Sequence, residues 1–221
     1  MNTAGHIQLE PRWPVALAVF ASALLLGMLP DRIRFFPIWV TWALGLTAII
    51  PILAAALMGA KEPRWLRVER AAILFLFPVV ALSTVANLMN LVTTMVERPA
   101  DVSGVQLLSS SIGVWVTNVI IFALLFWQID RGGPEMRLDH HRTIPDWLFP
   151  QETAPSEDVA RDWHPTFVDY LYLGYSTATA FSTTDAMPLT ARAKLLMMLE
   201  SAFSLMTVVV VASRAINILG S

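Results

Sequence analysis

The sequence predicts an all-α membrane protein with five transmembrane helices and one shorter, re-entrant helix before the last of them. Composition indicates the class, because 56% of the 221 residues are hydrophobic and only 14% are charged, against about 25% charged residues in soluble domains. The mean hydropathy is +0.59. Five apolar runs approach or exceed the roughly 20 residues with which a helix crosses the hydrocarbon core of a bilayer. We therefore expect a multi-pass protein in contact with membrane lipid.

The lengths of the apolar runs set the expected spans. They cover residues 14–29, 36–58, 71–96, 105–127 and 195–219. Six of the eight Trp lie near the ends of these spans, where an amphipathic ring prefers the headgroup layer. The first span is short, but no cleavage-like stretch follows it, so we expect it to be retained rather than removed as a signal peptide.

One extended polar segment, residues 130–165, separates the fourth and fifth spans. It contains five of the fourteen Pro and eight acidic residues against four Arg. An independent domain usually needs upwards of about 50 residues. The segment is therefore expected to be a loop with short surface helices, and the chain to form one membrane domain.

The residues after this loop have the layout of a pore loop. Residues 166–181 form a short helix that is too rich in Ser and Thr to span comfortably, and a polar turn at residues 182–185 follows. Asp185, Pro188 and Glu200 then share the register of the pore module of tetrameric potassium channels, which this tail resembles. In those channels a short helix leads into the selectivity filter and its closing Asp, and an inner helix follows.

The resemblance implies a division of the chain into two regions. Residues 1–104 would form a three-span amino-terminal membrane region, and residues 105–221 a channel-like pore module. The module would consist of an outer helix, a polar loop, a re-entrant helix, a filter-like turn and an inner helix, at residues 105–127, 130–165, 166–181, 182–185 and 191–219. The resemblance also implies a homo-oligomer, a tetramer by analogy, through which a monovalent cation passes. The remainder resembles bacterial multi-pass proteins of similar length, which implies the bacterial inner (plasma) membrane.

The filter-like residues differ from a potassium filter in their chemistry. By this register the ion pathway would be lined by Thr179, Ala180, Phe181, Ser182, Thr183, Thr184 and Asp185. Ser182 and Thr184 replace the two filter glycines, which accept the positive φ that aligned carbonyls need and which β-branched residues adopt poorly. We therefore expect a cation-permeable channel of weak or unusual selectivity, in which a ring of Asp185 favours cations.

In a second interpretation of the same residues, the protein does not conduct ions. Asp185 would cap the helix that follows, and the hydroxyls would satisfy backbone groups in the turn. Phe181, at the position of the filter Val, would plug the axis. The protein would then be a non-conducting structural or regulatory membrane protein that retains the pore fold. Kinked spans at Pro51 and Pro78 leave a small-solute transporter as a further alternative.

Three residues are expected to support the module: Pro188, Glu200 and Tyr170. Glu200 lies five residues inside the last expected span, where an ionisable side chain usually faces a protein interior with a partner. We expect it to pack behind the re-entrant helix and to bond Tyr170, Tyr172 or a Thr. The alternative is a proton-responsive or ion-coordinating group.

Basic residues favour one membrane orientation and the channel resemblance favours the other. Eleven of the fifteen Lys and Arg lie on the amino-terminal side of the five spans. Short loops rich in Lys and Arg stay in the cytoplasm, and residues 61–70 contain four of them. This rule places the re-entrant loop at the cytoplasmic face, whereas potassium-channel pore loops enter from outside. A span count that is wrong by one would also remove the conflict.

Several functions are not expected from this sequence. The chain contains no Cys, so disulfides, thiol catalysis and thiolate metal sites are excluded. A net charge of −2 offers no basic surface for nucleic acid. No catalytic or nucleotide-binding motif occurs, so we expect no enzyme and no cofactor. The adjacent His140 and His141 are expected to be solvated in the polar loop rather than to bind a metal, and the intramembrane Asn87, Asn90 and Asn118 to hold helices together.

Overall fold

The computed structural model describes residues 10–58, 64–97, 103–138, 144–155, 157–160, 163–179 and 185–219. Its α-helices are α1 (Trp13–Gly27), α2 (Ile38–Met58), α3 (Arg64–Glu97), α4 (Gly104–Ile129), α5 (Pro134–Leu138), α6 (Phe167–Thr179) and α7 (Ala191–Leu219). Two short 3-10 helices, η1 (Asp130–Gly132) and η2 (Pro150–Glu152), and two strands, β1 (Trp147–Leu148) and β2 (Met187–Pro188), complete the described elements.

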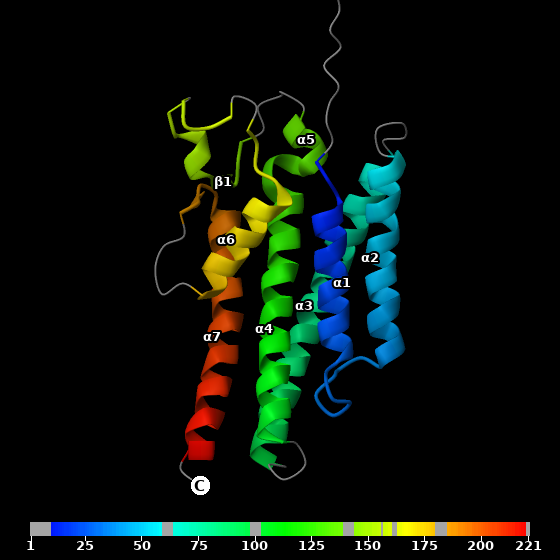
Figure 1. The fold of residues 1–221 in the computed structure, drawn as a ribbon, viewed down its shortest axis with the longest axis vertical. Coiled ribbons are helices and arrows are strands. Elements are labelled where there is room, and N and C mark those ends of the chain that lie inside the picture. The colour runs from blue at the N-terminus through cyan, green and yellow to red at the C-terminus, as the bar shows by residue number, and fades with distance from the viewer. Residues whose placement is uncertain are drawn as a thin grey trace, which may run out of the picture.

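Helix α4 is the centre of the bundle. It packs against α1, α3, α6 and α7, and α2 packs on the outer side of α1 and α3 (Figure 1). No charged residue occurs between Gly104 and Ile129, so the helix can be surrounded on all sides without burying a charge. A larger share of α4 than of α2 or α3 is accordingly buried.

Three described helical segments are long and apolar enough to cross a membrane: Ile38–Met58, Arg64–Thr94 and Val105–Gly132. Helix α1, with 15 residues, is apolar but shorter. The expected class, an all-α protein with helices that can cross a membrane, is therefore confirmed.

Helix α3 begins at Arg64, whereas its apolar run predicts a start at residue 71. Apolar runs mark only the part of a helix that lies in lipid, and a helix continues into polar surroundings when its charged residues find partners. Glu69 and Arg70 do so, because Glu69 pairs with Arg12 and Arg70 donates to the carbonyl of Gly132. The first turns of α3 therefore belong to a polar end of the bundle.

The polar segment after α4 folds back onto the helices. It reverses direction at Arg131, Gly132 and Gly133, which have φ of 53°, 82° and 98°, a conformation that glycine adopts without steric cost. Strand β1 then pairs antiparallel with β2, so that Trp147 lies opposite Pro188. Trp147 is fully buried, with its ring centroid 4.8 Å from that of Phe126. The segment contains short helices, as expected, but its aromatic residues extend the core.

Candidate functional site

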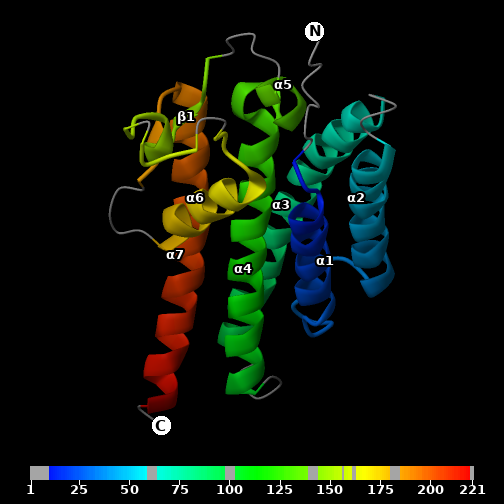
Figure 2. The same cartoon turned by 45° about the horizontal axis from the view of Figure 1, so that its top comes forward.

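Helix α6 and the start of α7 form a hairpin whose two ends meet at the same end of the bundle. Helix α6 crosses α4 obliquely (Figure 2), and α7 begins near the level at which α6 begins (Figure 1). At the first turn of α6, Thr166 donates from its backbone and its hydroxyl to Asp169. This local cap explains why the helix begins at Phe167.

Helices α4, α6 and α7 lie close together at Gly174. A Cβ added to this glycine would lie 3.1 Å from the carbonyl oxygen of Val119 and 3.3 Å from Oε1 of Glu200. Those distances are shorter than ordinary van der Waals contact. The absence of a side chain at this position therefore allows α6 to lie against both neighbours.

Glu200 lies at this crossing and is fully buried. Neither carboxyl oxygen has a hydrogen-bond partner among the described residues. The expected bond with Tyr170, Tyr172 or a Thr is therefore wrong. Tyr170 donates to Asp130 instead, and Tyr172 donates to Asp185. Glu200 faces Gly174, which offers no polar group. A charged carboxylate without a partner is strongly disfavoured in such surroundings.

We expect Glu200→Gln to change stability little, because an amide has nearly the shape of a neutral carboxyl group and no ion pair is lost. The shift in the free energy of unfolding should stay below about 1 kcal/mol. Unfolding in mixed detergent and SDS micelles measures it. A loss several times larger would mean that Glu200 is ionised and paired in the folded protein.

Hydrogen bonds between helices surround this carboxyl group. Asn118 Nδ2 donates to Ser204 Oγ at 3.1 Å, and Ser201 Oγ donates to the carbonyl of Thr177 at 3.1 Å. The prediction that Asn118 joins helices is confirmed. The other two intramembrane amides hold the connection between α1 and α2, since Asn87 accepts from the backbone of Phe35 at 2.6 Å and Asn90 donates to the carbonyl of Ile33 at 3.2 Å.

The described filter-like residues lie on the exposed side of the hairpin. Thr179 ends α6 and its hydroxyl donates to the carbonyl of Tyr175 at 2.8 Å. Asp185 accepts from the hydroxyl of Tyr172 at 3.1 Å and is exposed. The remaining members, Ala180, Phe181, Ser182, Thr183 and Thr184, lie outside the described residues.

Thr190, not Asp185, caps α7. Its hydroxyl group accepts from the backbone N–H of Ala193 at 3.2 Å and donates to the carboxylate of Asp146 at 2.6 Å. Asp185 lies too far before the helix for this role, because the strand that contains Pro188 intervenes. Asp185 therefore does not cap α7, and its described hydrogen bond is with Tyr172.

A pocket of about 280 Å³ lies beside the carboxyl end of α6. It is lined by Trp115 from α4, Thr177 and Thr179 from α6, and Ser201 and Leu205 from α7. The three hydroxyls donate to helix carbonyls and keep lone pairs free as acceptors. The pocket thus presents acceptor oxygens beside the negative end of a helix dipole, an arrangement that favours a cation.

The hairpin is attached to a group of buried polar side chains that the sequence indicates only faintly. We call it the buried charge cluster; its members are Glu10, Arg12, Glu69, Asp130, Arg137, Asp146 and Tyr170. They come from the segment before α1, from α3, from η1 directly after α4, from α5, from the segment before β1 and from α6. The four carboxylates are balanced by two Arg of the cluster and by the flanking Arg131 and Arg192.

Asp130 is the member that connects most elements. Its carboxylate accepts from the backbone of Asp146 at 2.7 Å and from the hydroxyl of Tyr170, and Arg131 Nε lies 3.6 Å away. Burial raises the pKa of the Tyr170 hydroxyl well above its usual range, so this group stays a donor. Asp130 therefore fastens both α6 and the segment before β1 to the end of α4.

Glu10 fastens the first turn of α6 from the other side. One carboxylate oxygen accepts from the backbone of Phe167 and the other from Trp127 Nε1 at 2.9 Å. Arg12 and Arg137 each approach this carboxylate at 3.8 Å and stack on the ring of Trp127. Arg12 also pairs with Glu69 at 3.2 Å. The segment before α1 is thereby joined to α3, α4 and α6.

Asp146 holds the other end of the hairpin. Besides Thr190, it accepts from the guanidinium of Arg192 in the first turn of α7. Its backbone carbonyl accepts from Leu189 at 2.8 Å. Both ends of the hairpin are therefore fixed to one cluster.

The described residues contain no group of three or more His, Asp or Glu side chains that could hold a metal ion. His140 and His141 lie outside them. Comparison of the chain with models of protein families, with curated proteins and with solved structures finds no match.

Proposed function

We propose that this chain is a subunit of a potassium-channel-like integral membrane protein, a cation-permeable channel of weak or unusual selectivity. The observation that supports it best is the hairpin of α6 and α7. Both of its ends are tied to the buried charge cluster at one end of the bundle. Thr179, at the far end of α6, and Asp185, on the returning segment beside Tyr172, are exposed. A segment that enters and returns on one side, with polar groups at its turn, suits an ion pathway.

In this proposal α1, α2, α3, α4 and α7 span the bacterial inner membrane and α6 is the re-entrant helix. The described basic residues on the amino-terminal side, among them Arg12, Arg70 and Arg137, gather at the end of the bundle that carries the cluster. Basic ends favour the cytoplasm. We therefore propose that the hairpin enters from the cytoplasmic face, inverted relative to potassium channels.

One hairpin cannot enclose an axis, so the proposal requires a homo-oligomer, with four subunits by analogy. Helix α7 buries one stripe, including Ala193, Glu200, Ser204 and Thr207, against its own chain. Its other faces expose large apolar side chains, among them Met198 and Leu205. Those faces are available for neighbouring subunits and lipid.

The test is cation flux into liposomes that contain the purified protein. We expect flux of a monovalent cation, and a several-fold decrease for Asp185→Asn, because a ring of carboxylates concentrates cations at the entrance. Asp158→Asn is the matched control, since Asp158 is an exposed carboxylate in the polar segment. Equal flux for both variants would exclude Asp185 from the pathway.

A folded, oligomeric protein that passes no cation at any voltage or pH would support the other interpretation instead. The chain would then be a structural or regulatory membrane protein that retains the hairpin without a pathway. Cross-linking in the membrane establishes whether the oligomer forms.

A further inference from the structure

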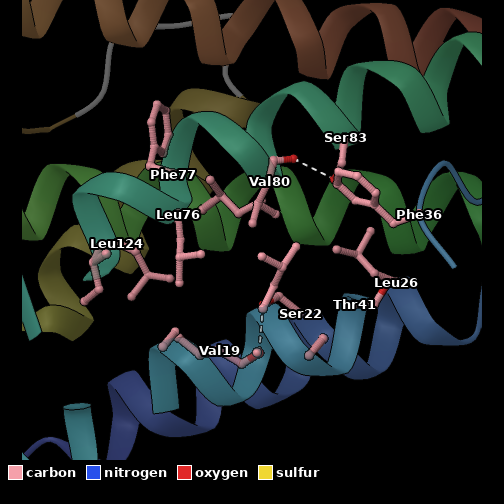
Figure 3. Close-up of a pocket in the computed structure, with 16 residues that line it drawn as sticks. Val19, Ser22, Leu26, Phe36, Thr41, Leu76, Phe77, Val80, Ser83 and Leu124 are labelled. Atoms are coloured by element: carbon pink, nitrogen blue, oxygen red, sulfur yellow. Dashed lines mark hydrogen bonds between the residues drawn. The ribbon is translucent and has the colours of Figure 1, made fainter. Parts of the chain in front are cut away.

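A second cavity lies on the opposite side of α4, between α1, α2 and α3. Its walls are Val19 and Ser22 of α1, Thr41 and Ala48 of α2, and Leu76 and Ser83 of α3 (Figure 3). Ile121 and Leu124 of α4 form its floor. None of these residues belongs to the hairpin or to the buried charge cluster.

The cavity has one apolar end and one end with hydroxyl groups. Leu76, Phe77 and Leu124 lie together at one end, and Ser83 lies with Thr41 and Phe36 toward the other (Figure 3). Ser83 donates to the carbonyl of Val80 at 3.0 Å. Ser22 likewise donates to the carbonyl of Val19 at 2.8 Å. Because both serines satisfy their donors within their own helices, the cavity demands no hydrogen bond from an occupant and favours an apolar one.

The cavity reaches the outer surface of the bundle. Phe36, Leu44, Phe77 and Val80 line it and are only half-buried. Helices α2 and α3 are long and apolar enough to cross a membrane, so the medium outside this opening is lipid. An apolar opening toward lipid fills with lipid rather than water.

The length and volume of the cavity indicate what kind of molecule it can bind. From Ile73 to Ser83 the lining extends over ten helical steps, or about 15 Å, which is about half of the hydrocarbon thickness of a bilayer. The hydroxyl end points toward the connection between α1 and α2, where Trp39 is exposed as membrane-interface tryptophans are. The cavity volume is about 70 Å³, which suits part of one flexible chain.

We infer that this cavity binds one acyl chain of a phospholipid from the leaflet on the side of the connection between α1 and α2. The chain enters beside Phe36 and its end lies near Leu76 and Leu124. The inference requires that α2 and α3 cross the membrane, and it does not depend on conduction. Arg34, in the same connection, already donates to Gly27 and Asp31, so the inference concerns the chain and not a headgroup.

The test uses the full chain in nanodiscs of phosphatidylcholine that carries a photoactivatable diazirine on one acyl chain. After irradiation, we expect cross-links on Leu76 and Val80, which face the cavity, in addition to Leu82, which is 70% exposed and meets bulk lipid. Labelling of Leu82 without Leu76 would overturn the inference while leaving the membrane location intact. Absence of all three labels would overturn both.

Two variants separate a cavity site from general lipid contact. Ala48→Phe fills the cavity and should lower labelling of Leu76 about tenfold, because each methylene that is excluded loses several-fold in affinity. Ala56→Phe on the exposed side of α2 should leave it unchanged. Ser83→Leu fills the other end and serves as the second variant if Ala48→Phe does not fold. Unchanged labelling of Leu76 in a folded filling variant would contradict the inference.

Discussion

Asp130→Ala is expected to lower the free energy of unfolding by about 3 kcal/mol or more, the loss that follows when one partner of a buried charged group is removed. Asp130 is fully buried. Its removal leaves the hydroxyl of Tyr170 and the backbone N–H of Asp146 without their acceptor and deprives Arg131 of a nearby countercharge. Unfolding in mixed detergent and SDS micelles measures the change.

Two control variants distinguish loss of the Asp130 charge from loss of its acceptor oxygens and from loss of any carboxylate. Asp130→Asn keeps an acceptor oxygen for one or both donors, so its loss should be smaller, about 1 kcal/mol. Asp158→Ala removes an exposed carboxylate and should have almost no effect. If Asp130→Ala were as mild as Asp158→Ala, the cluster would not fasten the hairpin.

The long helices of the bundle are predictable because the sequence features that define each of them are local. Residues 36–58 and 105–127 are expected spans, and the structure has helices at Ile38–Met58 and Gly104–Ile129. The hairpin follows too, since the helix expected over 166–181 is found at Phe167–Thr179 and the inner helix begins at Ala191 as expected. Apolarity and caps act within a few turns, so a single sequence contains them.

The partners of the candidate residues are not predictable in this way. Burial of Glu200 follows from its depth in an apolar helix, but its neighbour depends on how α6 is rotated against α7. That rotation brings Gly174 to Glu200 and directs Tyr170, one turn earlier, to Asp130. The orientation of α6 thus gives Tyr170 a different partner from the one that its sequence position suggests.

The buried charge cluster has only a faint signal in the sequence. Glu10 and Asp130 stand beside apolar runs, where charged residues ordinarily mark the boundary of a span. Glu10 contacts Phe167 across 157 positions and Arg12 contacts Glu69 across 57. Pairings over such separations depend on the packed bundle, so periodicity and composition do not indicate them.

Glu10→Ala is expected to release the first turn of α6 and to destabilise the protein by about 3 kcal/mol. Its carboxylate accepts from the backbone of Phe167 and from Trp127. A negative charge at a helix start is also favoured by the helix dipole. Without it, Arg12 and Arg137 keep buried positive charges with less compensation. Hydrogen exchange of the backbone amides measures the release directly.

The pattern of exchange distinguishes a specific anchor from general loosening of the bundle. In Glu10→Ala, exchange should rise most at the first turn of α6, while the middle of α2, which lies away from the cluster, should change little. Glu10→Gln retains an acceptor for Phe167 and should give an intermediate result, and Glu157→Ala, an exposed position, should match the unaltered protein. Uniform acceleration in every helix would mean that Glu10 contributes only to overall stability. A selective rise at α6 would establish that the segment before α1 positions this helix, so that a ligand or modification near the amino terminus has a physical route to the hairpin.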